Sequence, residues 1–235
     1  MILIDNVLKK FESTIAVDID NLIINRGDSF GLIGNNGAGK TTLLKIILDL
    51  LKPSKGSVLS NGRNVYQSEH WKVYTSSYID SHFLIEFLQP EEYFDLIASL
   101  YKIEENKLSE ILLMFSGFMR DEILHTGKLI RQLSLGNKQK VGIIGALLSN
   151  PMVLILDEPF NFLDPSSQII LKQILKDLSI NFGTTIIVSS HNLIHISEIC
   201  TRIGLMERGK IIKDCINSHD EIREIENYFK DQINQ

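Results

Sequence analysis

The chain has 235 residues, which is enough for one large domain or for one domain with a subdomain. Hydrophobic residues make up 44% of it and charged residues 23%, a balance that predicts ordinary globular folding rather than disorder. The net charge of −5 and the pI near 5.7 argue against a nucleic-acid-binding protein with a broad basic surface, so any phosphate binding must be local.

Membrane-spanning and secretory segments are not expected. No apolar stretch approaches the ~18 residues of a membrane-spanning helix, and the first ten residues, MILIDNVLKK, lack the basic-then-apolar order of a secretory signal. Cys200 and Cys215 stand in no metal-ligand spacing, which favours free thiols in a reducing cytoplasm. We therefore expect a cytoplasmic protein that would serve a membrane only through another chain.

Short β-branched runs near the start of the chain predict a small antiparallel sheet. The runs at 13–24 and 57–59, the second followed by an Asn61-Gly62 turn signal, flank the apolar segment 30–33. That segment leads into a glycine-rich stretch, and the two together read as a strand followed by a loop.

Residues 34–42, GNNGAGKTT, fit the pattern G-x-x-x-x-G-K-[ST] between this strand and the helix-like segment LLKIILDLL. The glycines leave room for backbone N–H groups that converge on phosphate oxygens, and the following helix presents the positive end of its dipole to the same anion. Lys40 would reach the β- and γ-phosphates, Thr41 would bind Mg²⁺, and Thr42 would support the loop. A glycine-rich turn that only caps a helix is the alternative, but it does not require Lys-Thr-Thr. The predicted phosphate-binding residues are Gly34, Asn35, Asn36, Gly37, Ala38, Gly39, Lys40, Thr41 and Thr42.

Between residues 89 and 148 the pattern changes to helical segments such as PEEYFDLIASLY and LSEILLMF, with no clear buried strand. We predict an α/β fold in which a P-loop NTPase core with a mostly parallel sheet carries a flanking antiparallel β-subdomain and an inserted helical subdomain. The expected limits are 1–80 and 150–215 for the core, 81–149 for the helical subdomain and 216–235 for a C-terminal helix.

Residues 153–156 predict a buried strand that delivers Asp157 and Glu158 at its carboxyl end, where open α/β sheets bind ligands. Asp157 would hold the Mg²⁺ shell, directly or through water. Glu158 would orient and deprotonate an attacking water. Helix capping or a salt bridge would explain the pair if it stood alone, but the glycine-rich loop in the same chain favours the catalytic interpretation.

The last third of the chain continues the alternation of strands and helices. Apolar runs at 184–190 and 202–206, with a helical stretch at 166–181, are typical of a parallel sheet covered on both faces. In the tail, 221–235, the residues Ile222, Ile225, Phe229 and Ile233 stand three or four apart, which predicts an amphipathic helix packed on the core. A partner-binding helix is the alternative.

The segment LSLGNKQK, residues 133–140, provides a second anion site. Ser134 offers a hydroxyl, Gly136 permits close approach of backbone, and the start of the following helix adds its dipole. Ordinary capping of a Ser-x-x-Asn helix start is the local alternative. With this segment the chain resembles an ATP-binding cassette ATPase over nearly its whole length. In that family the corresponding motif, usually LSGGQ, faces the γ-phosphate held by a second subunit, so the resemblance implies a head-to-tail dimer enclosing two ATP molecules.

Three further positions match the family. His191 falls at the switch histidine, which contacts the γ-phosphate and the catalytic glutamate, so Glu158, His191 and Lys40 are the expected catalytic residues. Asp164 in NFLDP matches the aspartate that couples the two sites of the dimer. Phe11 falls where an aromatic residue stacks on adenine, although a core phenylalanine is an equal alternative.

Several positions depart from the family pattern. Leu135 and Asn137 replace a glycine and the glutamine of LSGGQ, and Phe160 and Phe162 stand where many relatives carry threonine and glycine. The family's Q-loop glutamine, expected after the strand at 73–78, has no counterpart. Asp80 is the best positional candidate for it, with Ser81 close behind, and an aspartate there could contact Mg²⁺ through water.

The motif variants are most similar to ATPase subunits of bacterial drug and antibiotic-peptide exporters. That resemblance implies ATP and Mg²⁺ as ligands, pairing with a second copy or with a paralogue, and docking of a separate transmembrane permease at the inner face of the cell membrane. A soluble cassette ATPase, such as one serving iron–sulfur cluster assembly, remains open, as does a regulatory module that senses ATP without turnover. Chromosome-maintenance relatives are disfavoured because 235 residues cannot hold their long coiled coils.

Overall fold

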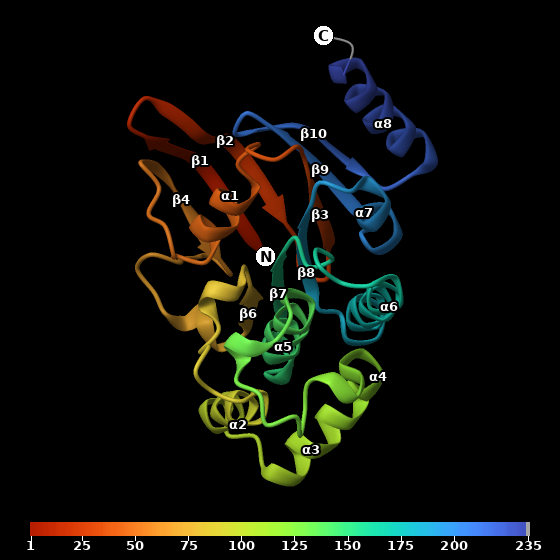
Figure 1. Ribbon diagram of the computed structural model, residues 1–235. Helices are drawn as coiled ribbons and strands as arrows, with labels where there is room; N and C mark the ends of the chain where they lie inside the picture. The colour runs from red at the N-terminus through yellow and green to blue at the C-terminus, as the bar shows by residue number, and fades with distance from the viewer. Residues whose placement is uncertain (234–235) are drawn as a thin grey trace.

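Two sheets organise the upper part of the molecule, and a lobe of helices forms its lower end in the computed structural model, which describes residues 1–233 and side chains through Gln232 (Figure 1). The smaller sheet is antiparallel with the strand order β2-β1-β4-β5. Its strands are β1 (Ile2–Phe11), β2 (Thr14–Ile24), β4 (Lys55–Ser60) and β5 (Arg63–Asn64). This sheet confirms the predicted β-subdomain. It also contains β1, whose pairing with β2 shifts register between Lys9 and Lys10.

The larger sheet has six strands in the order β10-β9-β3-β8-β7-β6. Its strands are β3 (Ser29–Ile33), β6 (Thr75–Tyr78), β7 (Val153–Asp157), β8 (Thr185–Ser190), β9 (Arg202–Glu207) and β10 (Lys210–Ile216). All neighbours are parallel except β9 and β10, which form a hairpin at the edge. The three central strands β3, β7 and β8 are buried along their whole length, which explains their continuous apolar sequences.

Successive side chains along these central strands point to opposite faces of the sheet and belong to two separate hydrophobic cores. Phe30, Ile155 and Ile187 join the first core, which lies under the antiparallel sheet around α1 (Lys40–Ile47). Their neighbours Leu154 and Val188 join the second core on the other side of the sheet. That second face is covered by α5 (Leu135–Leu148), α6 (Pro165–Phe182) and α7 (Leu193–Ile199). The large sheet is therefore covered on both faces, as an α/β fold requires.

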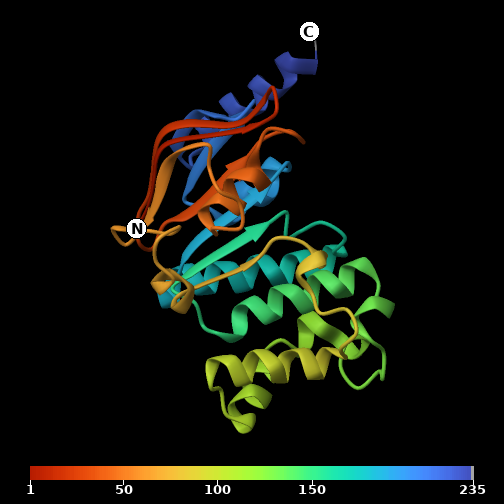
Figure 2. The same cartoon turned by 90° about the vertical axis from the view of Figure 1, so that its left-hand side faces the viewer.

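Every element between β6 and β7 is helical, and these elements confirm the inserted helical subdomain (Figure 2). They are the 3-10 turns η2 (Ser81–Phe83), η3 (Arg120–Glu122) and η4 (Ile130–Gln132) and the helices α2 (Pro90–Tyr101), α3 (Glu105–Met114), α4 (Ser116–Met119) and α5; a further turn, η1 (His70–Val73), precedes β6. Helix α5 joins this lobe to the sheet and is buried over most of its length, because it packs on both. The residue limits proposed for the subdomains stay a prediction.

The last described element is α8 (His219–Ile233), which lies at the end of the molecule opposite the helical lobe (Figures 1 and 2). Ile225 is buried, and Ile222 and Phe229 pack beside it against the second core, as the spacing predicts. The side chain of Ile233 and residues 234–235 lie outside the described residues. None of the helices within residues 1–233 combines the length and the apolar character needed to cross a membrane. Cys200 and Cys215 carry free thiols.

Candidate functional site

The predicted phosphate-binding loop, residues 34–39, connects β3 to α1, and its glycines are required by its geometry. A Cβ atom on Gly34 would lie 2.3 Å from the carbonyl oxygen of Met206, and one on Gly39 would lie 2.2 Å from that of Ala16. Gly37 has a φ of +81°, a conformation that side chains rarely adopt. Gly39 is also the N-cap of α1. Because glycine has no side chain to cap the helix, the first N–H groups of α1 are not capped by a side chain.

Lys40 lies inside this loop. Its side chain is 6% exposed, and its Nζ donates to the carbonyl oxygens of Gly34 at 2.6 Å and of Asn35 at 3.3 Å. The same ammonium lies 3.4 Å from Oε1 of Glu158. The cation that the motif assigns to phosphate therefore points at the inner face of the loop and toward the predicted general base.

Asp157 and Thr41 form an oxygen pair next to Lys40. Thr41 Oγ1 donates to Asp157 Oδ2 at 2.5 Å, and Ser189 donates to the other carboxylate oxygen from the neighbouring strand. Burial raises the pKa of Asp157, and the hydrogen bonds from Ser189 and Thr41 oppose that shift. A carboxylate beside a hydroxyl fits Mg²⁺, which usually takes one or two carboxylates together with substrate phosphates. No cluster of three or more potential His, Cys, Asp or Glu ligands occurs within residues 1–233, and such a Mg²⁺ site does not require one.

Glu158 is held by its backbone as well as by its side chain. Its φ of +46° is left-handed, and its N–H donates to the carbonyl oxygen of Ser189 at 3.2 Å and to Ser189 Oγ at 3.0 Å. Its Oε2 lies 2.9 Å from Nδ1 of His191, whereas its buried Oε1 has no hydrogen-bond partner among the described residues. Gln139 of α5 donates to the Glu158 carbonyl at 3.3 Å. The carboxylate therefore has one oxygen fixed by His191 and one that faces the Lys40 ammonium at 3.4 Å without a hydrogen bond, a suitable arrangement for a base that takes a proton from water once that ammonium binds phosphate.

Ser134 and Gly136 lie at the exposed start of α5. Ser134 caps the helix by accepting a hydrogen bond from the Asn137 N–H at 3.2 Å, so the local capping interpretation holds. A Cβ on Gly136 would lie 2.6 Å from the Phe162 carbonyl oxygen, so close approach of backbone requires glycine there. Both residues line a cavity of about 540 Å³ to which the phosphate-binding loop contributes nothing.

Asp164 lines the same cavity but is engaged in a structural contact. It caps α6 through the N–H groups of Ser166 and Ser167, accepts from Ser167 Oγ at 2.5 Å, and pairs with Arg120 at 3.1 Å. The Ser167 hydroxyl is the main reason that the pKa of Asp164 is lowered to about 2. A role for Asp164 across a dimer stays a prediction.

Asp80 shares a cavity with residues of the site, whereas the contact found for Phe11 is with Lys9. Asp80 accepts hydrogen bonds from the His82 N–H at 2.8 Å and lies 2.9 Å from His82 Nδ1, and it lines a cavity of about 310 Å³ together with Asp157 and Glu158. Phe11 ends β1 with 47% of its surface exposed and with the Lys9 ammonium 5.0 Å from its ring centroid. Their assignments to Mg²⁺ and to adenine stay predictions.

Two supporting residues were not identified from the sequence. Ser189 reaches Asp157 only because β7 and β8 pair in parallel, and Gln139 reaches Glu158 only because α5 packs beneath β7. The serines at the end of the run 184–190 were visible as polar residues in an apolar strand, but nothing local indicated their partner. Gln139 lies in the motif segment itself and carried no signal of a backbone contact.

Comparisons with known proteins give two family matches, and the one that covers more of the chain is the ABC transporter family. The protein family described as ABC transporter matches residues 17–161, and a family described as AAA domain, putative AbiEii toxin, Type IV TA system, matches residues 127–197. The uncharacterized ABC transporter ATP-binding protein YhcH of Bacillus subtilis is 34% identical over 228 residues, which cover 95% of this chain and 72% of YhcH. The bacitracin transport ATP-binding protein BcrA of Enterococcus faecalis is 34% identical over 89% of this chain and 67% of its own length. The methionine import ATP-binding protein MetN 1 of Shouchella clausii is 34% identical over 91% of this chain and 64% of its own length.

Solved structures share the fold. The ATP-binding subunit of an ABC transporter superposes with a TM-score of 0.83 at 26% identity, covering 97% of this chain and 93% of the other. A dimeric ATP-binding cassette in a post-hydrolysis state, bound to ADP and Pi, superposes with a TM-score of 0.81 at 24% identity, covering 93% of this chain and 99% of the other.

Proposed function

The chain is an ATP-binding domain of the ABC transporter family, and on that premise we propose that it hydrolyses ATP between two cassettes to drive a separate membrane permease. The observation that carries the proposal is the cluster of Lys40, Glu158 and His191 beside the Thr41–Asp157 pair. These residues lie at or just beyond the carboxyl ends of the parallel strands β3, β7 and β8, which meet at one edge of the sheet.

Binding of ATP gives the buried ammonium of Lys40 new partners. Its N–H groups now donate to two loop carbonyls, and the Glu158 carboxylate lies 3.4 Å away as its counter-ion. Phosphate oxygens compete for these donors with stronger, charge-assisted hydrogen bonds. The exchange leaves Glu158 less strongly paired and available to a water molecule. Thr41 and Asp157 would hold the Mg²⁺ ion, which neutralises charge on the phosphates when bound.

Hydrolysis then needs a water oriented for in-line attack. The water oxygen forms a bond to the γ-phosphorus, the bond to the bridging oxygen of ADP breaks, and Glu158 accepts the proton that the water loses. His191 keeps Oε2 of that carboxylate in place through the 2.9 Å contact. The products are ADP and phosphate.

A second cassette, either another copy or a paralogue, is proposed to supply Ser134 and Gly136 to the γ-phosphate. The exposed start of α5 and its separation from the loop of its own chain support this arrangement. Charge-assisted contacts of this kind contribute roughly 1.5–3 kcal/mol each, so loss of the γ-phosphate on hydrolysis is enough to reopen the dimer.

The permease is proposed to dock between the sheet edge and the helical lobe, near the Asp80 segment. A cavity of about 420 Å³ lies there, and Phe83 and Leu100 on its wall are 52% and 72% exposed. On this proposal the chain would lie at the inner face of the cell membrane through its partner. We propose an exporter of drug or antibiotic-peptide type, on the strength of the LSLGNKQK segment and the likeness to BcrA.

Two experiments test these proposals. Phosphate release from purified protein with MgATP tests the ATPase, and absence of MgATP-dependent release from the protein and its copurified partners would contradict it. Affinity purification from the native membrane tests the transporter: a multi-span partner supports it, whereas a soluble complex alone contradicts it.

A further inference from the structure

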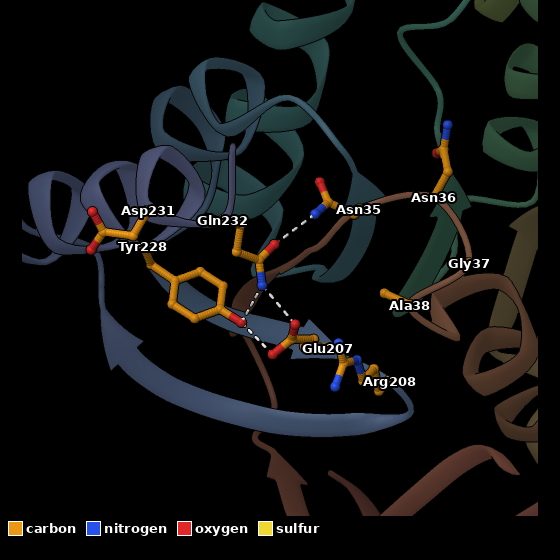
Figure 3. Close-up of a pocket in the computed structure, with 9 residues that line it drawn as sticks. All are labelled: Asn35, Asn36, Gly37, Ala38, Glu207, Arg208, Tyr228, Asp231 and Gln232. Carbon is orange, nitrogen blue, oxygen red and sulfur yellow. Dashed lines mark hydrogen bonds between the residues drawn. The ribbon is translucent and has the colours of Figure 1, made fainter. Parts of the chain in front are cut away.

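Helix α8 forms one wall of a cavity at the first half of the phosphate-binding loop. The cavity has a volume of about 780 Å³ and is lined by loop residues 35–38, by residues 207–208 at the end of β9, and by three residues of α8 (Figure 3). These three are Tyr228, Asp231 and Gln232. The last described turn of the chain thus lies beside the loop that begins at residue 34.

A chain of hydrogen bonds joins the helix to the loop. Asn35 Nδ2 donates to Gln232 Oε1 at 3.0 Å, across 197 residues of sequence. Gln232 Nε2 in turn donates to Glu207 Oε1 at 2.6 Å and to the Tyr228 hydroxyl at 2.8 Å. The Tyr228 hydroxyl donates to the other oxygen of Glu207. Burial and this bond raise the pKa of Tyr228 to about 12, so the phenol stays a donor.

The position of Gln232 is determined by the rest of α8. Lys213 on β10 pairs with Glu221 and Glu224 in the first turns of the helix, at 2.5 Å each. Tyr228 and Gln232 stand four residues apart, so they share the helix face that meets Glu207. The helix is therefore held at both ends, and these contacts fix the position from which the Gln232 side-chain amide reaches Asn35.

Asn35 joins this network to the lysine of the site. Its side chain points toward Gln232, whereas Asn36 points away from the helix (Figure 3). Its backbone carbonyl accepts a hydrogen bond from Lys40 Nζ at 3.3 Å. The same residue therefore contacts the phosphate-binding cation through its main chain and α8 through its side chain.

We propose that Gln232, supported by Tyr228 and Glu207, is a positioning residue that holds the phosphate-binding loop in the shape that ATP requires. A loop with three glycines among residues 34–39 loses much conformational freedom when it closes on phosphates. Fixing Asn35 in advance removes part of that ordering cost and so strengthens nucleotide binding. By linkage, nucleotide binding stabilises the docked helix to the same extent. This inference rests on ATP binding at residues 34–42.

Substitution Gln232→Met tests the inference, because it removes the amide while retaining most of the side-chain volume. We expect the KM for ATP and the calorimetric Kd for MgADP to rise roughly two- to tenfold, the range for one hydrogen bond. The kcat should stay within about twofold, since the catalytic residues do not touch Gln232. Tyr228→Phe should shift KM in the same direction by less. Asn227→Ala, which removes an exposed amide on the same helix outside the cavity wall, is the matched control and should leave KM unchanged.

A double-mutant cycle separates positioning from a general weakening of the fold. Asn35→Ala and Gln232→Met should each raise KM, and the double variant should be no worse than the poorer single variant. Hydrogen exchange gives a readout independent of turnover: MgADP should slow exchange in residues 219–232 of the wild type, but less so in Gln232→Met.

An unchanged KM in Gln232→Met, strictly additive effects in the cycle, or helix exchange that is indifferent to MgADP would each overturn the inference. All three require a wild-type protein that binds nucleotide. Failure of the wild type to bind would instead contradict the proposed function.

Discussion

The carboxyl edge of the large sheet and the start of α5 carry the two segments that the sequence predicts to bind phosphate, and they are built very differently. At the sheet edge Lys40 and Asp157 are each 6% exposed and are bonded to their neighbours. At the start of α5 Ser134 is exposed, and Leu135 and Phe162 beside it are 55% and 66% exposed. The side chains of the first region, called here the complete region, contact one another within a single chain, whereas those of the second, the open region, face outward. The contrast supports the proposal that the open region acts on a nucleotide held by a second cassette.

The largest expected effect lies in the complete region. Glu158→Gln keeps the shape of the side chain but removes its basicity, so hydrolysis should fall by roughly 10²- to 10⁴-fold. ATP should still bind, and the variant should accumulate as a nucleotide-bound dimer. Phosphate release measures the first effect and size-exclusion chromatography with MgATP the second. A variant that binds ATP but stays monomeric under all conditions would count against the two-cassette arrangement.

Removal of the Lys40 ammonium should act first on the binding of ATP, ahead of any effect on its hydrolysis. Lys40→Ala deletes the ammonium that faces the loop interior, and loss of one or two charge-assisted contacts should weaken ATP binding roughly 10- to 100-fold. Titration calorimetry with ATP checks this. Unchanged affinity would remove residues 34–42 from the nucleotide site.

A smaller and more selective effect is expected in the open region. Ser134→Ala removes one hydroxyl at the exposed helix start, so the affinity of a single chain for ADP should stay the same while ATP-dependent dimerisation weakens roughly tenfold. Analytical ultracentrifugation with and without ATP, in a Glu158→Gln background, measures dimerisation. Equal dimerisation with and without the hydroxyl would show that the two regions do not meet.

The smallest effect concerns Asp164. It lies in the open region, but hydrogen bonds and an ion pair fix its carboxylate within its own chain. Asp164→Ala should cost about 1 kcal/mol of unfolding free energy through loss of the α6 cap. Because the pKa of Asp164 falls from 3.8 to about 2 on folding, its contribution is present above about pH 4 and is lost as the pH falls toward 2. Urea denaturation at pH 7 and at pH 2.5 should show the variant and the wild type converging at the lower pH.

Asp164→Ser keeps a capping oxygen and therefore distinguishes the two roles of this position. Full stability with reduced ATP-dependent hydrolysis would support coupling across a dimer, whereas full stability with full activity would leave the residue as a helix cap only.

Much of the site was predictable because its pieces are contiguous in sequence. The loop at 34–42 contains its glycines, its lysine and its threonine within nine residues, and Asp157 and Glu158 follow directly on an apolar strand. The fold class and the tail helix were predictable from hydrophobic periodicity for the same reason. The hairpin strand β10 was not, because its half-buried alternation is hard to distinguish from a surface segment.

By itself, then, the sequence determined which groups are available for phosphate chemistry, since strand ends, glycine spacing and helix starts are local properties. Only the tertiary structure decided which of these groups meet. Ser189 reaches Asp157 through the register of two parallel strands, Gln139 reaches Glu158 through packing of a buried helix, and Gln232 reaches Asn35 from the far end of the chain. Strand register and helix docking are set by the summed burial of many side chains distant in sequence, and no short segment contains that information.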